Sequence, residues 1–157
     1  MKTKRVFVEA EIQWDERIEA GEDAPFAVAV FDLNDLKVIN DTYGHDRGDA
    51  YLKAACTVIC RVFRYSPVYR IGGDEFSVIL QNDDYHNREA LLKQFDEEVA
   101  RINSTAVNRW EELHVSAGIA VYDPQNDSAV VDVTRRADKI MYENKRAYYR
   151  ESGTDGR

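Results

Sequence analysis

Hydrophobic and polar positions change period several times along the chain, and each period predicts one kind of secondary structure. Through residues 5–20, Val6, Ala10, Trp14 and Ile18 fall at helical spacing on one face of a predicted helix. Residues 25–33 instead form a run of small and branched apolar side chains, typical of a buried strand. The same criteria predict helices over 34–44, 49–65, 87–103 and 130–149, and strands over 67–71, 75–81 and 113–122.

The order of these predicted elements, α-β-α-α-β-β-α-β-α, lacks the regular alternation of a doubly wound sheet. The fifth and sixth elements are strands joined by a tight turn at Gly72 and Gly73, so they predict a hairpin. We therefore expect an α+β fold with one central, mostly antiparallel sheet wrapped by helices. No internal repeat or linker interrupts the pattern, and residues 1–157 are predicted to form a single domain.

Composition and charge narrow the classes of function. The chain has 157 residues, of which 44% are hydrophobic, enough for a real core. Its 21 Lys and Arg face 29 Asp and Glu, a net charge of −8 that disfavours nucleic acid as the main partner. A phosphate ligand would therefore need a metal ion or a few placed cations. The longest apolar run, residues 26–31, is far too short to cross a bilayer, so we expect no membrane insertion and a cytoplasmic location.

The chain has two cysteines, Cys56 and Cys60, which lie four positions apart in a predicted helix. This spacing matches neither a redox pair nor a zinc knuckle, and no third cysteine could complete a metal site. The favoured interpretation is two free thiols in a reducing compartment, with at least one packed in the core.

Three carboxylates stand at the ends of predicted strands. Asp32 ends the first strand, and Asp74 with Glu75 follows the Gly72–Gly73 turn. If the hairpin pairs beside the first strand, Asp32 and Asp74 converge, and converging carboxylates need a cation between them. Mg²⁺ favours such hard oxygen ligands. The alternative is a solvated turn, because Asp and Glu are common in turns. From the residues alone, a site for metal and phosphate is only slightly favoured over a solvated turn.

Further polar residues follow Asp32 in the stretch "FDLNDLKVINDTYGHDRGD". Lys37 could direct an ammonium at a phosphate, and Asn40 with Asp49 could match the edge of guanine. Each also has a structural explanation, since Asn40 or His45 could cap a helix and Lys37 could be a surface charge. Together these residues indicate a nucleotide site only if they share one cleft.

Several of these motifs together resemble the GGDEF domain of bacterial diguanylate cyclases. "RIGGDEF" has "FDLNDLKVINDTYGHDRGD" upstream and "HVSAGIAVY" and "RRADKIMYENK" downstream, in the family's order and spacing, from about Pro25 to Lys145. The resemblance implies a ferredoxin-like core similar to the palm of polymerases and to nucleotidyl cyclases. It also implies condensation of two GTP molecules into cyclic di-GMP with release of pyrophosphate.

The resemblance implies a metal site and a set of catalytic residues. Asp32, Asp74 and the Leu33 carbonyl would bind Mg²⁺ or Mn²⁺. Asp74 would also be the candidate base for the attacking 3′-hydroxyl, with Glu75 beside it, and Lys37 would stabilise charge on the transferring phosphoryl group. Such a reaction depends on positioning and on cations that neutralise charge.

The resemblance also implies substrate contacts and a partner. Asn40 and Asp49 would read guanine, His45 would line the same pocket, and Lys145 would reach the terminal phosphates. Asp49 favours GTP for both halves of the product. Each domain would hold one GTP, so turnover would require a transient homodimer in which two domains face each other.

The match departs from the family at several places, one of which is Tyr149, where the family tends to carry an arginine. Family members usually carry a D-x-L-T-G-L-x-N-R-like segment before the first helix, whereas this chain begins "MKTKRVFVEAEI". We therefore expect a domain cut from a larger sensor protein and lacking that segment. The family's R-x-x-D product-inhibition motif falls on Phe63 and Ser66, which predicts no feedback inhibition through that site.

Two alternatives to an active cyclase remain. The chain could be a GTP-binding or protein-interaction module that keeps the motif without turnover, although its intact motif residues argue against degeneration. A purely structural domain with an acidic hairpin would require every motif position to coincide by chance.

Overall fold

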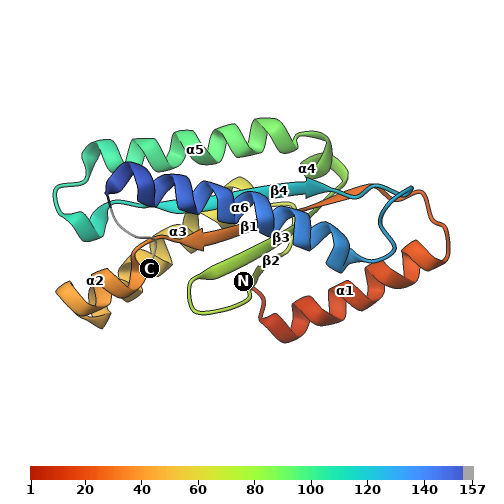
Figure 1. Cartoon of the computed structure of the whole chain (residues 1–157), viewed down its shortest axis with the longest axis horizontal. Helices are drawn as coiled ribbons and strands as arrows, with labels where there is room; N and C mark the ends of the chain where they lie inside the picture. The colour runs from red at the N-terminus through yellow and green to blue at the C-terminus, as the bar shows by residue number, and fades with distance from the viewer. Residues whose placement is uncertain (154–157) are drawn as a thin grey trace.

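The computed structural model describes residues 1–153 and is built on a four-stranded sheet (Figure 1). Its strands lie in the order β2–β3–β1–β4, and every neighbouring pair is antiparallel. Their bounds are β1 Phe26–Leu33, β2 Val68–Arg70, β3 Glu75–Gln81 and β4 Val115–Val121. With helices after β1 and after β3, this βαββαβ succession is ferredoxin-like. The predicted α+β fold with an antiparallel sheet is confirmed.

The helices follow the predicted order, with two short additions. A five-residue helix, α4, comes directly after β3, and a three-residue 3₁₀ helix, η1, precedes β4; the sequence pattern predicted neither. The helical bounds are α1 Lys4–Glu19, α2 Leu36–Tyr43, α3 His45–Val62, α4 Asn82–His86, α5 Arg88–Thr105, η1 Arg109–Glu111 and α6 Val130–Ser152.

Helices cover both faces of the sheet, as Figure 1 shows, with α6 in front and α3 behind. One core lies between the sheet and α3 with α5, where Phe31 packs against Phe63 and Phe95. The other lies between the sheet and α1 with α6, where Trp14 packs against Phe26. Since β1 alternates between these two cores, it is buried along its length except at Asp32, which is half-buried. Asp32 therefore lies near the C-terminal end of β1, where the strand approaches solvent.

Helix α6 crosses the sheet at Gly118 on β4. A Cβ at this position would overlap the carbonyl of Ala137 and the amide of Met141, so only glycine permits this approach. The close packing fixes α6 against β4 and β1 and thereby places the later turns of α6 beside the end of β1. None of the helices within residues 1–153 is both long and apolar enough to cross a membrane.

Candidate active site

The β2–β3 turn brings its carboxylates beside the end of β1. Glu75 pairs with Asp32 in the β1–β3 register, and the Leu33 N–H donates to the Asp74 carbonyl at 2.9 Å. The exposed Arg70 guanidinium holds the turn by donating to the carbonyls of Gly72 (3.2 Å) and Gly73 (2.9 Å). The structure thus brings Asp32, Asp74 and Glu75 together at one end of the sheet.

Lys145 of α6 supplies the nearest cation to these carboxylates. Its Nζ lies 3.0 Å from Asp32 Oδ1, and the two side chains are 18% and 15% exposed. Burial raises the pKa of Asp32; Lys145 acts in the opposite direction, and the neighbouring Asp74 raises that pKa further. The net direction is upward, so the single ammonium does not fully offset burial and carboxylate repulsion.

Glu75 lies in a more acidic environment than Asp32. Burial raises its pKa first, and the negative charges of Asp138, Asp32 and Asp74 raise it further, with only Lys4 opposing them. Asp138 comes from α6, and its Oδ1 atom is buried without a hydrogen-bond partner among the described residues. The site therefore carries excess negative charge, which an added cation would neutralise.

The donor set suits a hard divalent ion that also binds substrate. No group of three His, Cys, Asp or Glu side chains within residues 1–153 is arranged to hold a metal by itself. Asp32 and Asp74 supply carboxylates, and Leu33, whose N–H donates to the Asp74 carbonyl, follows Asp32 in the chain. Mg²⁺ is commonly bound by one or two carboxylates together with phosphate oxygens and waters. The Lys145 ammonium shows that a positive charge is accommodated beside Asp32, and the oxygen donors present fit a divalent ion such as Mg²⁺.

Asp35, the residue directly before helix α2, makes side-chain contacts that the sequence did not predict. Asp35 adopts the left-handed conformation (φ 65°), and its carboxylate accepts hydrogen bonds from Arg109 (2.9 Å) and the Tyr148 hydroxyl (2.7 Å). Its main-chain N–H donates to the Tyr149 hydroxyl at 3.1 Å. These contacts join η1 and the end of α6 to the segment between β1 and α2, and so fix where α2 starts.

The predicted guanine-reading residues lie at the corner between α2 and α3. Asn40 faces the first turn of α3, where its side chain covers Gly48, and a Cβ on that glycine would overlap the Asn40 amide. Asp49 is the next residue of α3, so Asn40 and Asp49 share this corner. Lys37 and His45 are exposed on the same two helices. Within residues 1–153, no hydrogen bond or ion pair joins this corner to Asp32, Asp74 or Lys145.

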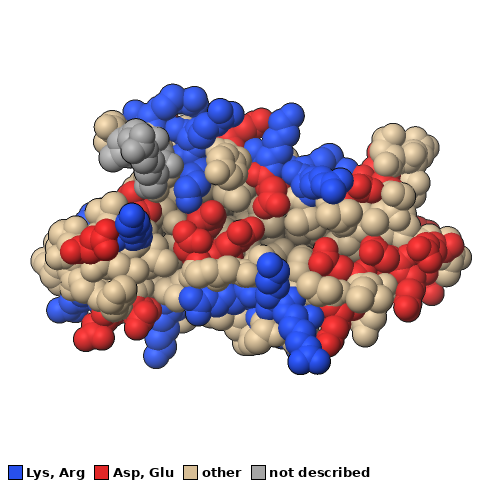
Figure 2. All heavy atoms as spheres, turned by 60° about the horizontal axis from the view of Figure 1, so that its bottom comes forward, with Lys and Arg blue, Asp and Glu red and all other residues tan. Residues whose placement is uncertain are grey.

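The surface of the molecule carries side chains of both charges. Figure 2 shows acidic side chains gathered near the middle of one face, with Lys and Arg side chains above and below them. Such mixed charge is compatible with a polyanionic ligand held through a metal ion and a few cations.

The positions of the family's product-inhibition motif are occupied by core residues. Phe63 is fully buried against Phe31, and the buried Ser66 hydroxyl donates to Asp84 at 2.6 Å. Neither side chain presents a charge to solvent.

Comparison with known proteins agrees with this fold. The sequence profile described as "Diguanylate cyclase, GGDEF domain" matches residues 4–150. The chain therefore belongs to the GGDEF family of diguanylate cyclases. The resemblance predicted from the motifs is confirmed.

Relatives and solved structures extend the comparison. The chain is 31% identical over 137 residues to the diguanylate cyclase DgcZ and 30% identical over 129 residues to the probable diguanylate cyclase DgcT, both of Escherichia coli strain K12. These alignments cover 84% and 80% of this chain but only 44% and 28% of those proteins. The structure matches the GGDEF domain of DgcB from Caulobacter crescentus, solved in complex with c-di-GMP, with a TM-score of 0.75 and 26% identity over 92% of this chain and 85% of that one.

Proposed function

We propose that this chain is a diguanylate cyclase domain that joins two GTP molecules into cyclic di-GMP. The main support is the meeting of Asp32, Asp74 and Glu75 beside Lys145 at the end of the sheet. Membership of the family and the α2–α3 corner support the same assignment.

In this proposal, the 3′-oxygen of one GTP attacks the α-phosphorus of the other. The new P–O bond replaces the bond to pyrophosphate, which leaves, and the hydroxyl proton passes to Asp74. Repeating the step in the opposite sense closes the ring, so two GTP give one cyclic product and two pyrophosphates. Mg²⁺ or Mn²⁺, when bound, would neutralise the triphosphate and lower the pKa of the attacking hydroxyl.

The chain's own residues would bind and orient the substrate. Asp32, Asp74 and the Leu33 carbonyl are the proposed metal ligands, and Glu75 is the acidic neighbour of the base. Lys145 pairs with Asp32 at the site, so its ammonium would leave Asp32 and bind a phosphate oxygen when the triphosphate is present.

The α2–α3 corner carries the remaining proposed contacts. At the guanine edge, the Asn40 amide would donate and accept hydrogen bonds and the Asp49 carboxylate would accept them. His45 would line the same pocket, and Lys37 would approach the transferring phosphoryl group. Because one domain holds one GTP in this proposal, two domains must meet face to face for turnover.

The test is formation of cyclic di-GMP from GTP with Mg²⁺ or Mn²⁺ at low and high protein concentration, beside Asp74→Ala. A cyclase that acts as a transient dimer should give activity that rises faster than linearly with concentration and is lost in the variant. GTP binding without product at any concentration would reject the cyclase and favour a binding module. Unchanged product from Asp74→Ala would reject the assigned role of Asp74.

A further inference from the structure

Three sulfur atoms gather at α3, and none of the residues that carry them belongs to the proposed active site. The chain contains two cysteines and two methionines. Cys56 Sγ lies 3.9 Å from Cys60 Sγ and 3.5 Å from the Met1 Sδ atom, although Met1 is 55 residues away in sequence. Two thiols and a thioether therefore converge through tertiary structure.

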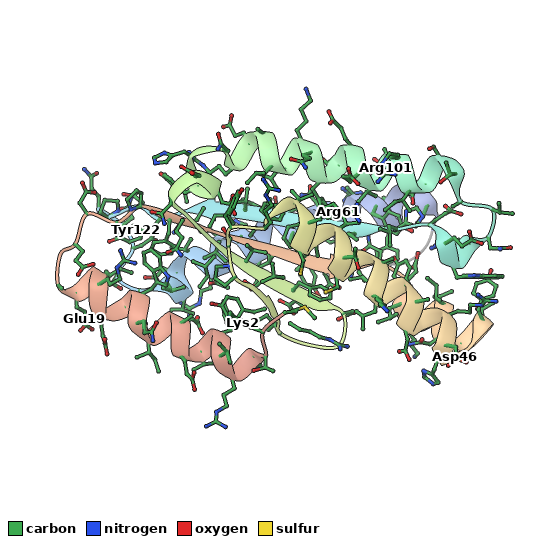
Figure 3. The ribbon with its side chains drawn as sticks, turned by 180° about the vertical axis from the view of Figure 1, so that it is seen from behind. Lys2, Glu19, Asp46, Arg61, Arg101 and Tyr122 are labelled. Atoms are coloured by element: carbon green, nitrogen blue, oxygen red, sulfur yellow. The ribbon has the colours of Figure 1, made fainter. Side chains whose placement is uncertain are left out.

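Helix α3 holds the two cysteines in place, and an isolated β-bridge of Lys2 with Tyr69 holds the backbone next to Met1. The cysteines are one turn apart on an 18-residue helix. Met1 is followed by Lys2, whose N–H donates to the Val68 carbonyl (2.9 Å) and whose carbonyl accepts from the Arg70 N–H (2.8 Å). Figure 3, in which Lys2 and the α3 residues Asp46 and Arg61 are labelled, looks onto this side of the molecule. The sulfur cluster is thus formed without rearrangement of the backbone.

The cluster is open to a ligand from solvent. Both cysteines are half-buried and unpaired, and Met1 is 60% exposed. Burial and the neighbouring Cys56 raise the pKa of the Cys60 thiol, while the N-terminal ammonium acts against them. Adjacent thiolates repel each other, and a bound cation would remove that repulsion.

The number and kind of donors select among metals. Zn²⁺ sites normally use four N, O or S ligands, and no group of three His, Cys, Asp or Glu side chains within residues 1–153 could provide them. Thiolate and thioether donors favour Cu(I) among common metals. Three sulfurs around one ion, at a metal–sulfur distance of about 2.3 Å, would be about 4 Å apart. The two observed separations, 3.9 Å and 3.5 Å, are close to this spacing.

We propose that Met1, Cys56 and Cys60 form a three-sulfur binding site for Cu(I). The ion would displace the two thiol protons and accept one lone pair from each sulfur, with no change of oxidation state. Bound Cu(I) would join the N-terminal segment to α3.

The test is an anaerobic titration of the reduced chain with Cu(I) supplied as its bicinchoninate complex. We expect each chain to remove one equivalent of Cu(I) from the chelator, and X-ray absorption of the product to show sulfur ligands alone. Cys56→Ser and Cys60→Ser should each weaken binding by at least about tenfold to a hundredfold, the loss typical when even a supporting partner of a metal ligand is removed.

Two methionine variants separate a specific site from general sulfur affinity. Met1→Leu, produced behind a cleavable leader in parallel with the unchanged chain, should weaken binding, whereas Met141→Leu in the core should not. Circular dichroism of each variant without metal checks that the fold persists. The proposal would be overturned by no transfer of Cu(I), by equal binding in the serine variants, by unchanged binding in Met1→Leu, or by preference for Zn²⁺. Because no nucleotide is present in the titration, its result is independent of cyclase activity.

Discussion

Lys145 Nζ lies 3.0 Å from Asp32 Oδ1, so an ammonium from α6 pairs with a carboxylate that precedes it by 113 residues. Asp32 is also a proposed metal ligand. The Lys145 ammonium and a metal ion would compete for the Asp32 carboxylate, since their positive charges repel each other. Lys145 is therefore the internal cation of the metal-free site and a proposed phosphate contact once substrate binds.

Replacing Lys145 with methionine should strengthen metal binding in the absence of nucleotide. Removal of a partly exposed ion pair worth about 1 kcal/mol corresponds to a gain of about fivefold in Mn²⁺ affinity. Electron paramagnetic resonance of free Mn²⁺ during a titration measures this directly. Lys139→Met, at an exposed position on the same helix, is the matched control and should leave the affinity unchanged. Weaker Mn²⁺ binding by Lys145→Met would contradict the competition.

Gly48→Ala should weaken GTP binding through the side chain of Asn40. The added Cβ would overlap the Asn40 amide, which must then leave its position over the first turn of α3. If that amide reads guanine, we expect GTP affinity to fall by about tenfold, the value of roughly one hydrogen bond to a ligand. Calorimetry with GTP and with ATP measures the effect.

Ala50→Gly, on the same turn of α3, is the comparison for Gly48→Ala, because it changes helix propensity without adding an atom near Asn40. A loss of affinity that is equal for GTP and ATP would show that Gly48 acts on the fold and has no part in guanine selection.

The sequence predicted the elements whose signal is local or periodic. Trp14 stands at helical spacing and is buried. The meeting of Asp32 with Asp74 also followed from sequence, since both stand at strand ends and the hairpin pairs beside β1. The helix α4 has five residues, too few to show a period.

The contacts at Asp35 could not be predicted, because they join segments far apart in sequence. Its partners Arg109 and Tyr148 lie 74 and 113 residues away, and neither belongs to a local motif. Tyr149 is the instructive case. It stands where the family usually carries arginine, and the structure shows a buried side chain whose hydroxyl accepts from the Asp35 N–H. The same reasoning applies to Met1, which no pattern connects to Cys56.

Tyr51→Phe should destabilise the domain without altering its core volume greatly. The fully buried Tyr51 hydroxyl lies 2.6 Å from the Asn34 carbonyl and accepts from the His114 N–H at 3.2 Å, so it links α3 to the ends of two strands. Its loss leaves buried main-chain groups unpaired at a cost of about 1–3 kcal/mol. Urea unfolding measures the change. Tyr65→Phe, at a side chain 67% exposed, should cost little, and equal losses in the two variants would refute the linking role.

Asp138→Asn should stabilise the metal-free domain at neutral pH and have little effect in acid. Burial raises the pKa of Asp138 in the folded protein, so the folded state binds its proton more tightly than the unfolded chain does. Stability is therefore lost as pH rises from the unfolded value of about 3.9 through the higher folded pKa. An amide at this position carries no charge and removes that loss.

Because the Asp138 side chain is only partly buried, the rise in Tm at pH 7 should be small, about 1–3 °C. Thermal unfolding in EDTA at several pH values measures the difference between Asp138→Asn and the unchanged chain. That difference should shrink as the pH falls through the folded pKa toward 4, since the carboxyl is then protonated in the folded state and carries no buried charge. Asp41→Asn, at an exposed residue, controls for the overall change in net charge. A Tm difference that is constant across this pH range would mean that the gain comes from packing, with no contribution from the buried charge.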